Sequence, residues 1–304
     1  MSTGEPTVSI IMNCFNGSRY LRQALDSVVA QTYRNWELIF WDNQSTDDSL
    51  LIVQSYKDPR VKIFINDHHT TLYAARNLAV GQVTGSLVAF LDTDDFWEVD
   101  KLSQQVPVFI DPEVGLVYGK YWFRDESGDS VYVGPAGDLP TGRILPTLLR
   151  SNYVGILTMI VRRSVLQKLD GPFKERYEVI GDTDLVLRVA KGWEIRAIER
   201  PVATYRWHDS NDTKIKAVRH AEEWVDWLTD TGRLRAFIDS PGFESRRTMI
   251  YKEVARCIVR KKNWEPLKKL YSESQNWSEK VFRVLNVSIY VSIYLVGRGQ
   301  PKTC

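Results

Sequence analysis

The sequence predicts an α/β protein in which a mostly parallel central sheet is flanked by helices and followed by a helical C-terminal extension. Three observations predict this fold class. The chain has 304 residues, 43% of them hydrophobic and 26% charged, which is enough to bury a large core. In its first third, short runs rich in β-branched and aromatic residues alternate with longer amphipathic stretches, as in consecutive strand-helix-strand units. Beyond Thr213 nearly every segment has helical spacing.

Four apolar runs in the first 100 residues are predicted to be strands of one sheet. They are Val8–Met12, Trp36–Trp41, Val61–Ile65 and Leu87–Leu91. Each is short, rich in β-branched or aromatic residues, and separated from the next by polar or turn-forming residues. The spacing leaves room for a helix between successive strands, which favours parallel pairing.

Three helices are predicted between these strands. The first lies between the first two strands, where apolar residues recur on one helical stripe: Tyr20, Leu21, Ala24, Leu25, Val28 and Val29. A second is expected to begin near Ser45 or Thr46, because Ser45 and Asp48 have the spacing of a capping box. A third is expected over residues 72–80, with Gly81 as its stop.

The pattern changes after Asp100. Further strands are predicted at Val114–Tyr118 and Tyr153–Val161, and helical spacing returns at Asp182–Ala190. We therefore place a domain boundary near residue 213, between an α/β domain and a helical C-terminal region.

Polar residues follow each of the four N-terminal strands directly. They are Asn13–Asn16, Asp42–Ser45, Asn66–His69 and Asp92–Asp95. In open α/β sheets the ligand crevice lies at the carboxyl ends of the strands. Three of these four segments contain acidic residues, which predicts a divalent cation such as Mg²⁺ or Mn²⁺ that in turn binds phosphate. A Gly-rich phosphate loop does not follow the first strand, which argues against a P-loop NTPase or a dinucleotide-dependent oxidoreductase.

Seven sequence pieces, in order over about residues 7–213, resemble family 2 glycosyltransferases with the GT-A fold. They are Val8–Met12 with Asn16-Gly17, Trp41–Asp48, Ala75–Asn77, Phe90–Asp95, Met159–Arg163, Asp182–Arg188 and Tyr205–His208. The resemblance implies an inverting, metal-dependent enzyme that uses a nucleoside-diphosphate sugar, with UDP as the expected nucleotide. It also implies that residues 1–100 bind the nucleotide sugar, and that 101–213 bind the acceptor and carry the catalytic base.

On the donor side, the resemblance implies that Asp42 binds the base or ribose and that Arg76 lies near the diphosphate. Cys14 and Asn16 are also predicted donor-binding residues, although the family usually has Pro-Thr where this chain has Asn13-Cys14. The structural alternatives are an Asx turn for Asp42 and a surface ion pair for Arg76.

On the reaction side, the resemblance implies that Asp92 faces the ribose and that Asp94 binds the metal, with His208 as a further metal or diphosphate ligand. Asp182 is the predicted catalytic base. Asp184 is the alternative, because the family's usual Glu-Asp pair is only half present here. A plain N-cap role for Asp182 also stays open.

The chemistry expected of these residues follows from charge development. The leaving diphosphate gains negative charge as the glycosidic bond breaks, and a cation held by Asp94 would stabilise it. A carboxylate on the opposite side would take the proton of the attacking hydroxyl. The expected acceptor is a saccharide or a lipid-linked sugar, and nucleic acid is not expected as a partner. Two rivals stay open: a sugar nucleotidyltransferase, and an inactive module that binds nucleotide or glycan.

Residues 214–304 form a basic region that differs from the rest of the chain. They carry 18 Lys and Arg against 10 Asp and Glu, whereas residues 1–213 carry 22 against 28. The uncharged stretch Val284–Val296 is shorter than the ~20 residues that span a bilayer. It fits a packed core helix, or an interfacial or oligomer-forming helix, and the basic residues 256–262 would suit an anionic membrane.

Cysteine usage and the N-terminus predict the compartment. Cys14, Cys257 and Cys304 have neither disulfide-framework nor metal-ligand spacing, and a secretory signal pattern is not visible at the N-terminus. We therefore expect a cytoplasmic protein, with peripheral contact at the inner face of the plasma membrane as a further expectation.

Overall fold

The computed structural model describes residues 5–126, 131–209, 211, 215–272 and 277–296. The chain divides into two compact units. The first comprises residues 1–144, 153–176 and 181–208, and the second comprises 145–152, 177–180 and 209–304. The predicted boundary at residue 213 lies outside the described residues.

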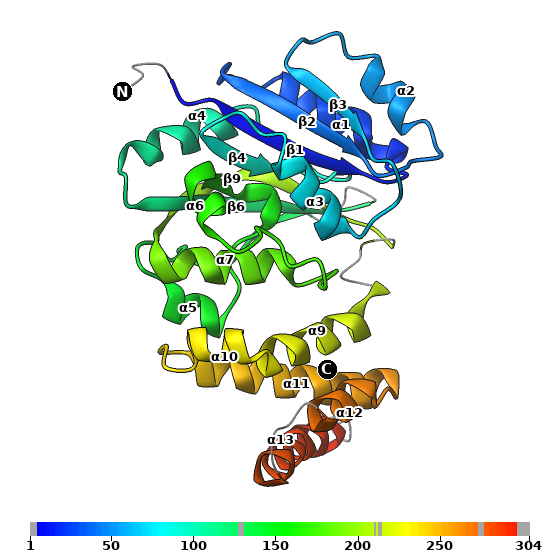
Figure 1. The fold of residues 1–304 in the computed structure, drawn as a ribbon, viewed down its shortest axis with the longest axis vertical. Coiled ribbons are helices and arrows are strands. Elements are labelled where there is room, and N and C mark those ends of the chain that lie inside the picture. Colours follow the sequence, from blue (N-terminus) through cyan, green and yellow to red (C-terminus); the bar gives the residue numbers. More distant parts are fainter. Residues whose placement is uncertain (1–4, 127–130, 210, 212–214, 273–276, 297–304) are drawn as a thin grey trace. The chain divides into compact units, whose positions relative to one another are not determined.

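The first unit is built on one mixed sheet, in which the described residues form nine strands (Figure 1). The strands are β1 (Val8–Cys14), β2 (Trp36–Asp42), β3 (Val61–Ile65), β4 (Leu87–Phe90), β5 (Phe96–Trp97), β6 (Val114–Asp125), β7 (Val131–Gly134), β8 (Ile160–Arg162) and β9 (Glu194–Trp207). Their order is β3-β2-β1-β4-β8-β6-β9-β5, and β7 pairs with β6. The four strands β3, β2, β1 and β4 are parallel to one another, and β6 is parallel to β9. The predicted α/β class with its parallel N-terminal sheet is confirmed.

Helices cover both faces of this sheet. They are α1 (Ser18–Val29), α2 (Ser49–Gln54), α3 (Leu72–Val80), α4 (Lys101–Gln105), α6 (Arg163–Lys168) and α7 (Gly181–Gly192), with the 3-10 turns η1 (Val106–Ile110) and η2 (Ile156–Thr158). Alternate residues of β1 and β2 pack with α1, α4 and η1 in one apolar core. On the opposite face, the ring of Phe90 from β4 meets Phe173, which stacks on Tyr73 of α3. Both faces of the central strands are therefore buried, as expected for parallel strands.

Two predicted elements differ from the structure. The second helix begins at Ser49 and not near Ser45, and its N-cap residue Asp48 makes no capping hydrogen bond with its side chain. The Ser45 amide instead donates to Asp42 Oδ2, and Thr46 N donates to Asn16 Oδ1, so these polar groups stabilise a loop. The predicted strand Tyr153–Val161 is mostly irregular backbone with the turn η2, and only β8 pairs in the sheet.

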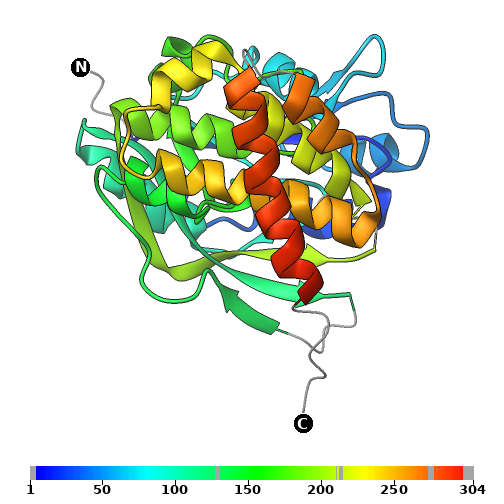
Figure 2. The same cartoon turned by 90° about the horizontal axis from the view of Figure 1, so that it is seen from below.

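The second unit is helical in its described part, as the sequence predicts. Its helices are α5 (Leu145–Arg150), α9 (Ala217–Thr229), α10 (Thr231–Phe237), α11 (Phe243–Lys261), α12 (Glu265–Ser272) and α13 (Trp277–Val296). Figure 2 shows α13 crossing α11, and these two helices share the most extensive contact of the unit. Fully buried Glu223 of α9 accepts hydrogen bonds from the backbone N–H groups of residues 178–180, which anchors that segment. Across the described residues, every helix is too short or too polar to cross a bilayer.

A buried carboxylate beside β1 and β2 makes the stability of the first unit depend on pH. Glu37 accepts hydrogen bonds from Ser9, from Thr84 and from Lys62 Nζ at 2.5 Å. Burial by itself raises the pKa of Glu37, but these hydrogen bonds outweigh it and lower the pKa to about 2. A carboxyl whose pKa is lowered by folding stabilises the folded state above its unfolded pKa, and that contribution is lost as the pH falls toward the folded value.

We therefore expect Glu37→Gln to lower the free energy of unfolding at pH 7 by about 2 kcal/mol. The deficit should shrink between pH 4.5 and pH 2.5, because wild type then loses the same contribution. Urea unfolding at several pH values measures both effects. Glu113→Gln is the matched control: Glu113 pairs with Arg143 on the surface, so its loss should change stability by no more than about 0.5 kcal/mol. A deficit that is equal at pH 7 and pH 2.5 would contradict the assignment.

Candidate functional site

The residues at the carboxyl end of β4 form a tight acidic turn. Leu91 N donates to the Ile11 carbonyl at 3.0 Å, which continues the sheet, and Asp95 N then donates back to the Asp92 carbonyl at 3.2 Å. The loop after β1 approaches this turn closely, because a Cβ added at Gly17 would lie 2.6 Å from Thr93 Oγ1. Only glycine permits that approach at this position, so the loop after β1 and the turn after β4 are held together.

The three carboxylates of the turn have three different environments. Asp92 is ion-paired with Arg76 of α3. Asp94 Oδ2 lies 3.0 Å from His208 Nε2, at hydrogen-bonding distance. Asp95 is buried and accepts a hydrogen bond from Arg206 N at 2.9 Å. Burial, followed by repulsion from the neighbouring carboxylates, raises the pKa of both Asp94 and Asp95, so this turn favours an additional positive charge.

Arg76 joins this turn to the predicted catalytic base. Its side chain is buried, and its guanidinium lies 5.4 Å from the ring centroid of Tyr73. Burial lowers the pKa of Arg76, but the Asp92 carboxylate, Tyr73 and the nearby Asp182 together raise it more, so the guanidinium stays charged. Burial raises the pKa of Asp182, and Arg76 partly offsets that rise. A single buried cation therefore lies within electrostatic reach of carboxylates from two elements, the turn after β4 and helix α7.

Asp182 and Asp184 lie in the first turn of α7 but have different surroundings. Asp182 is part-buried, its Oδ1 accepts a hydrogen bond from Thr183 N, and its own N–H donates to the Tyr73 hydroxyl. Asp184 is fully buried and pairs through Oδ2 with Arg188 Nε at 2.8 Å. Helix α7 begins one residue before Asp182, so Asp182 is not its N-cap.

The Asp184–Arg188 pair also positions the segment before α7. The Arg188 guanidinium donates to the carbonyls of Gly171 and Pro172, the two residues that precede Phe173 in the chain. From the other side, Asn77 of α3 donates to the Phe173 carbonyl and accepts from Phe173 N. The two hydrogen-bonded clamps fix Phe173 against Tyr73, so the buried carboxylate has an evident structural role.

The carboxyl ends of β1 and β2 carry the polar groups predicted to bind the nucleotide. Asp42 is fully buried; its Oδ2 accepts from Ser45 N, while its Oδ1 has no hydrogen-bond partner among the described residues. Asn13 on the neighbouring strand is buried too, and neither atom of its amide has a partner there. Buried polar atoms without partners are costly, and a ligand that hydrogen-bonds them removes the cost. The Asx turn anticipated for Asp42 is present, and it engages only one of the two oxygens.

Cys14 and Asn16, the other predicted donor-binding residues, make contacts within the protein. Cys14 is buried at the end of β1 with its Sγ 3.8 Å from Ser45 Oγ, and burial raises the pKa of the thiol. Asn16 is exposed, has φ of 53°, and uses its side-chain oxygen to accept from Thr46 N at 2.7 Å. Both residues shape the loop beside Asp42. Asn13, in contrast, has unpartnered polar atoms. Its position at the end of β1 is the sequence feature that marks it as a candidate site residue.

Arg206 is a site residue to which the sequence assigned no role, although it lies in the Tyr205–His208 motif. Besides its backbone bond to Asp95, its Nε donates to the Asp94 carbonyl at 3.0 Å. Its guanidinium also lies over the ring of Tyr20 at 4.3 Å. Arg206 therefore fixes the acidic turn against β9 and α1.

The residues present fit a cation that arrives together with a phosphate ligand. Among the described residues, there is no group of three His, Cys, Asp or Glu side chains placed to hold a metal ion. Asp94 and His208 together supply one carboxylate and one imidazole. Mg²⁺ usually binds through one or two carboxylates plus substrate phosphates and water, so this pair suffices when a diphosphate completes the shell.

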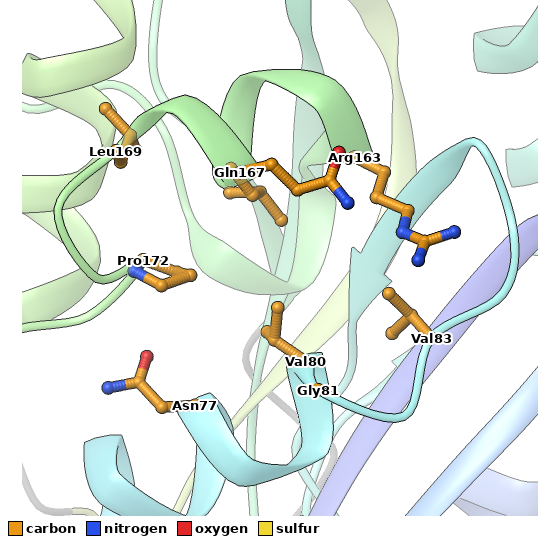
Figure 3. Close-up of a pocket in the computed structure, with 9 residues that line it drawn as sticks. Asn77, Val80, Gly81, Val83, Arg163, Gln167, Leu169 and Pro172 are labelled. Carbon is orange, nitrogen blue, oxygen red and sulfur yellow. The ribbon is translucent and has the colours of Figure 1, made fainter.

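A separate surface pocket lies between α3 and α6, with a volume of about 350 Å³ (Figure 3). Asn77 and Val80 line it from α3, and Arg163 and Gln167 from α6. None of the predicted site residues is among the described residues that line it. This pocket is therefore distinct from the candidate site at the strand ends.

Known proteins resemble this chain in sequence and in fold. The sequence profile described as glycosyl transferase family 2 matches residues 9–170. The protein WfgD of Escherichia coli, named as a UDP-Glc:alpha-D-GlcNAc-diphosphoundecaprenol beta-1,3-glucosyltransferase, is 33% identical over 237 residues. These cover 77% of this chain and 87% of WfgD.

Two solved structures match the fold of nearly the whole chain. Residues 1–349 of S. aureus TarS superpose with a TM-score of 0.68 at 18% identity, covering 98% of this chain and 93% of that one. The mannosyltransferase PcManGT of Pyrobaculum calidifontis, solved with GDP-Man and Mn²⁺, superposes with a TM-score of 0.57 at 17% identity, covering 98% and 89%. At these identities the likeness shows the fold alone, and the predicted GT-A fold is confirmed.

Proposed function

This chain belongs to glycosyl transferase family 2 and is a nucleotide-sugar-dependent glycosyltransferase, and from that premise we propose that it transfers a sugar from a UDP-sugar to a lipid-linked saccharide with inversion at the anomeric carbon. One observation carries the proposal. Buried Arg76 is ion-paired with Asp92 of the acidic turn and lies within electrostatic reach of Asp182 of α7, which supports a single site for the donor and the base.

The proposed donor site extends from β2 to the turn after β4. The unpartnered Oδ1 of Asp42 accepts a hydrogen bond from the nucleoside. The side-chain amide of Asn13 forms further hydrogen bonds to it, as donor through Nδ2 and as acceptor through Oδ1. Asp92 orients the ribose and Arg76 supplies positive charge near the diphosphate. The predicted roles of Cys14 and Asn16 become indirect in this proposal, because both residues position the loop beside Asp42.

Asp94 and His208 are the residues that would hold Mg²⁺ or Mn²⁺, and PcManGT was solved with Mn²⁺. When bound with the donor, the cation supplies positive charge that stabilises the leaving diphosphate. The raised pKa of Asp94 supports this proposal, because its crowded carboxylate is better ionised next to a cation.

Asp182 is the proposed base, and it acts in a single displacement. It takes the proton from the acceptor hydroxyl while the hydroxyl oxygen forms a bond to the anomeric carbon. The bond from that carbon to the phosphate oxygen breaks, and its electron pair stays with the nucleoside diphosphate. Attack from the side opposite the leaving group inverts the anomeric carbon. The part-buried position of Asp182 and its raised pKa suit a group that must accept a proton.

The acceptor class rests on the most informative relative, WfgD, whose name specifies a GlcNAc-diphosphoundecaprenol acceptor and a UDP-Glc donor. An undecaprenol-linked acceptor is anchored in a bilayer, so we place the reaction at the cytoplasmic membrane surface. The excess of Lys and Arg in residues 214–304 supports contact with anionic lipid.

The test is a transfer assay with a panel of UDP-, dTDP- and GDP-sugars and α-D-GlcNAc-diphosphoundecaprenol in anionic vesicles, with and without EDTA. We expect acceptor-dependent UDP release, a β-linked product, loss of activity with EDTA, and co-sedimentation of the chain with the vesicles. Release of pyrophosphate from UTP and a sugar phosphate would indicate a nucleotidyltransferase instead. Donor binding without turnover would indicate an inactive module, and a chain that stays in solution would contradict the membrane contact.

A further inference from the structure

Five aromatic side chains cluster on the sheet beside the candidate site, and the proposed mechanism does not use them. We call this cluster the aromatic platform; its members are Tyr121, Phe123, Tyr132, Tyr205 and Trp207. They come from three neighbouring strands, β6, β7 and β9. We propose that the aromatic platform binds the saccharide of the acceptor, an inference that rests on the proposed transfer reaction.

The strand register places the platform on one face. Phe123 pairs with Tyr132 of β7 on one side and with Tyr205 of β9 on the other, so these three residues form a single row across the sheet. Residues directly opposite on paired strands point to the same face. The ring centroids of Phe123 and Tyr132 are 4.6 Å apart with planes inclined by only 15°, and Trp207 extends the row with its centroid 5.5 Å from that of Phe123.

The platform is continuous with the reacting groups. Arg206, between Tyr205 and Trp207, donates from its backbone to Asp95 and from its Nε to the Asp94 carbonyl. The residue after Trp207 is His208, which lies against Asp94. The strand that carries two platform rings is therefore bonded directly to the turn that would hold the donor diphosphate. Tyr121 of the platform also lies within electrostatic reach of the Asp95 carboxylate, so the platform adjoins the acidic turn on its own face of the sheet.

The chemistry of the platform suits a pyranose ring. One face of such a ring presents C–H groups and is apolar, while its hydroxyls project from the rim. Flat aromatic rings bury the apolar face, and the hydroxyls of tyrosine can bond the rim, so amphipathic aromatic side chains fit such a ligand. Tyr132 is 55% exposed, far more than a core tyrosine, and leaves one ring available at the outer end of the row.

The test compares Tyr132→Ala with Val131→Ala in the full-length chain. Val131 precedes Tyr132 on β7, is 45% exposed, and points to the opposite face, so it is matched in strand and exposure. Two acceptors are used: α-D-GlcNAc diphosphate linked to undecaprenol, and the same headgroup on a short alkyl chain. We expect Tyr132→Ala to raise the acceptor KM about 3- to 10-fold with both acceptors, with an unchanged donor KM, and Tyr132→Phe to restore most of the affinity.

The outcomes distinguish a failure of the platform proposal from a failure of the proposed transfer reaction. A wild-type chain that transfers sugar to neither acceptor overturns the proposed function before any variant is compared. If wild type is active and Tyr132→Ala leaves the acceptor KM unchanged, the platform proposal is wrong and the reaction stands. A change seen only with the undecaprenol carrier, or equally in Val131→Ala, assigns the surface to lipid or to general folding and also overturns the proposal.

Discussion

Replacing Asp182 with asparagine is expected to lower the rate of sugar transfer by about 10²- to 10⁴-fold, the usual contribution of a general base. Donor affinity should stay close to that of wild type, because asparagine keeps the oxygen that accepts the hydrogen bond from Thr183 N. Steady-state transfer rates and calorimetric binding of UDP-sugar measure the two effects separately. The wild-type rate should fall as the pH drops through the raised pKa of Asp182, because protonation removes the base. This dependence should vanish in Asp182→Asn.

Asp184→Asn is the matched comparison on the same helix turn. Its loss leaves Arg188 buried without its carboxylate, which costs about 3–5 kcal/mol of stability when one partner of a buried pair is removed. We expect Asp184→Asn to have a lower midpoint of thermal unfolding. Its transfer rate should still fall at low pH as in wild type, which is the acidic limb of the pH profile. If Asp184→Asn abolishes that limb and Asp182→Asn retains it, the roles of the two carboxylates are the reverse of those proposed.

Removal of the Asp94 carboxylate is expected to abolish the effect of Mn²⁺ on donor binding and to lower transfer by about 10²- to 10³-fold, as when one stabilising group is lost from a transition state. The reason is that Asp94 and His208 are the residues that would hold a divalent cation arriving with the donor diphosphate. Calorimetric titration of Asp94→Ala with UDP-sugar, with MnCl₂ and then with EDTA, measures the loss directly.

Asp95→Asn serves as the control for Asp94→Ala. Asparagine can still accept the hydrogen bond from Arg206 N, so the acidic turn should keep its shape and the Mn²⁺ dependence should persist. Burial and its neighbours raise the pKa of Asp95, so losing that charge should cost little stability. Unchanged Mn²⁺-dependent affinity in Asp94→Ala would show that the cation is held elsewhere.

The parallel half of the sheet was predictable from the sequence nearly residue by residue. The structure confirms the third strand and the third helix at the predicted bounds, and extends the first two strands to Cys14 and Asp42. These strands are buried on both faces, so their apolar runs are uninterrupted and end where the ligand crevice begins. The polar residues at the ends of the parallel strands, including Asp42 and Asp94, could therefore be identified as candidate site residues without coordinates.

Other segments could not be predicted because distant residues decide their conformation. Ser45 and Asp48 have the spacing of a capping box, yet Asn16 from the loop after β1 binds Thr46 and holds that segment as a loop. A local pattern is a weak predictor when a partner 30 residues away offers the same backbone groups a competing hydrogen bond. The apolar stretch at 153–161 likewise has strand composition, but only its last residues reach a pairing partner in β4 and β6.

The sequence by itself determined the fold class, the family resemblance and the set of candidate carboxylates, because hydrophobic period and motif order are properties of the chain. Only the tertiary structure decided the surroundings of each carboxylate. Asp182 and Asp184 are two residues apart on one helix, so their side chains point about 200° apart around its axis. The packing of α7 then buries Asp184 against Arg188 and leaves Asp182 beside Tyr73, Arg76 and the acidic turn. Which face of a helix meets the sheet depends on contacts between distant segments, and that information is absent from the local pattern.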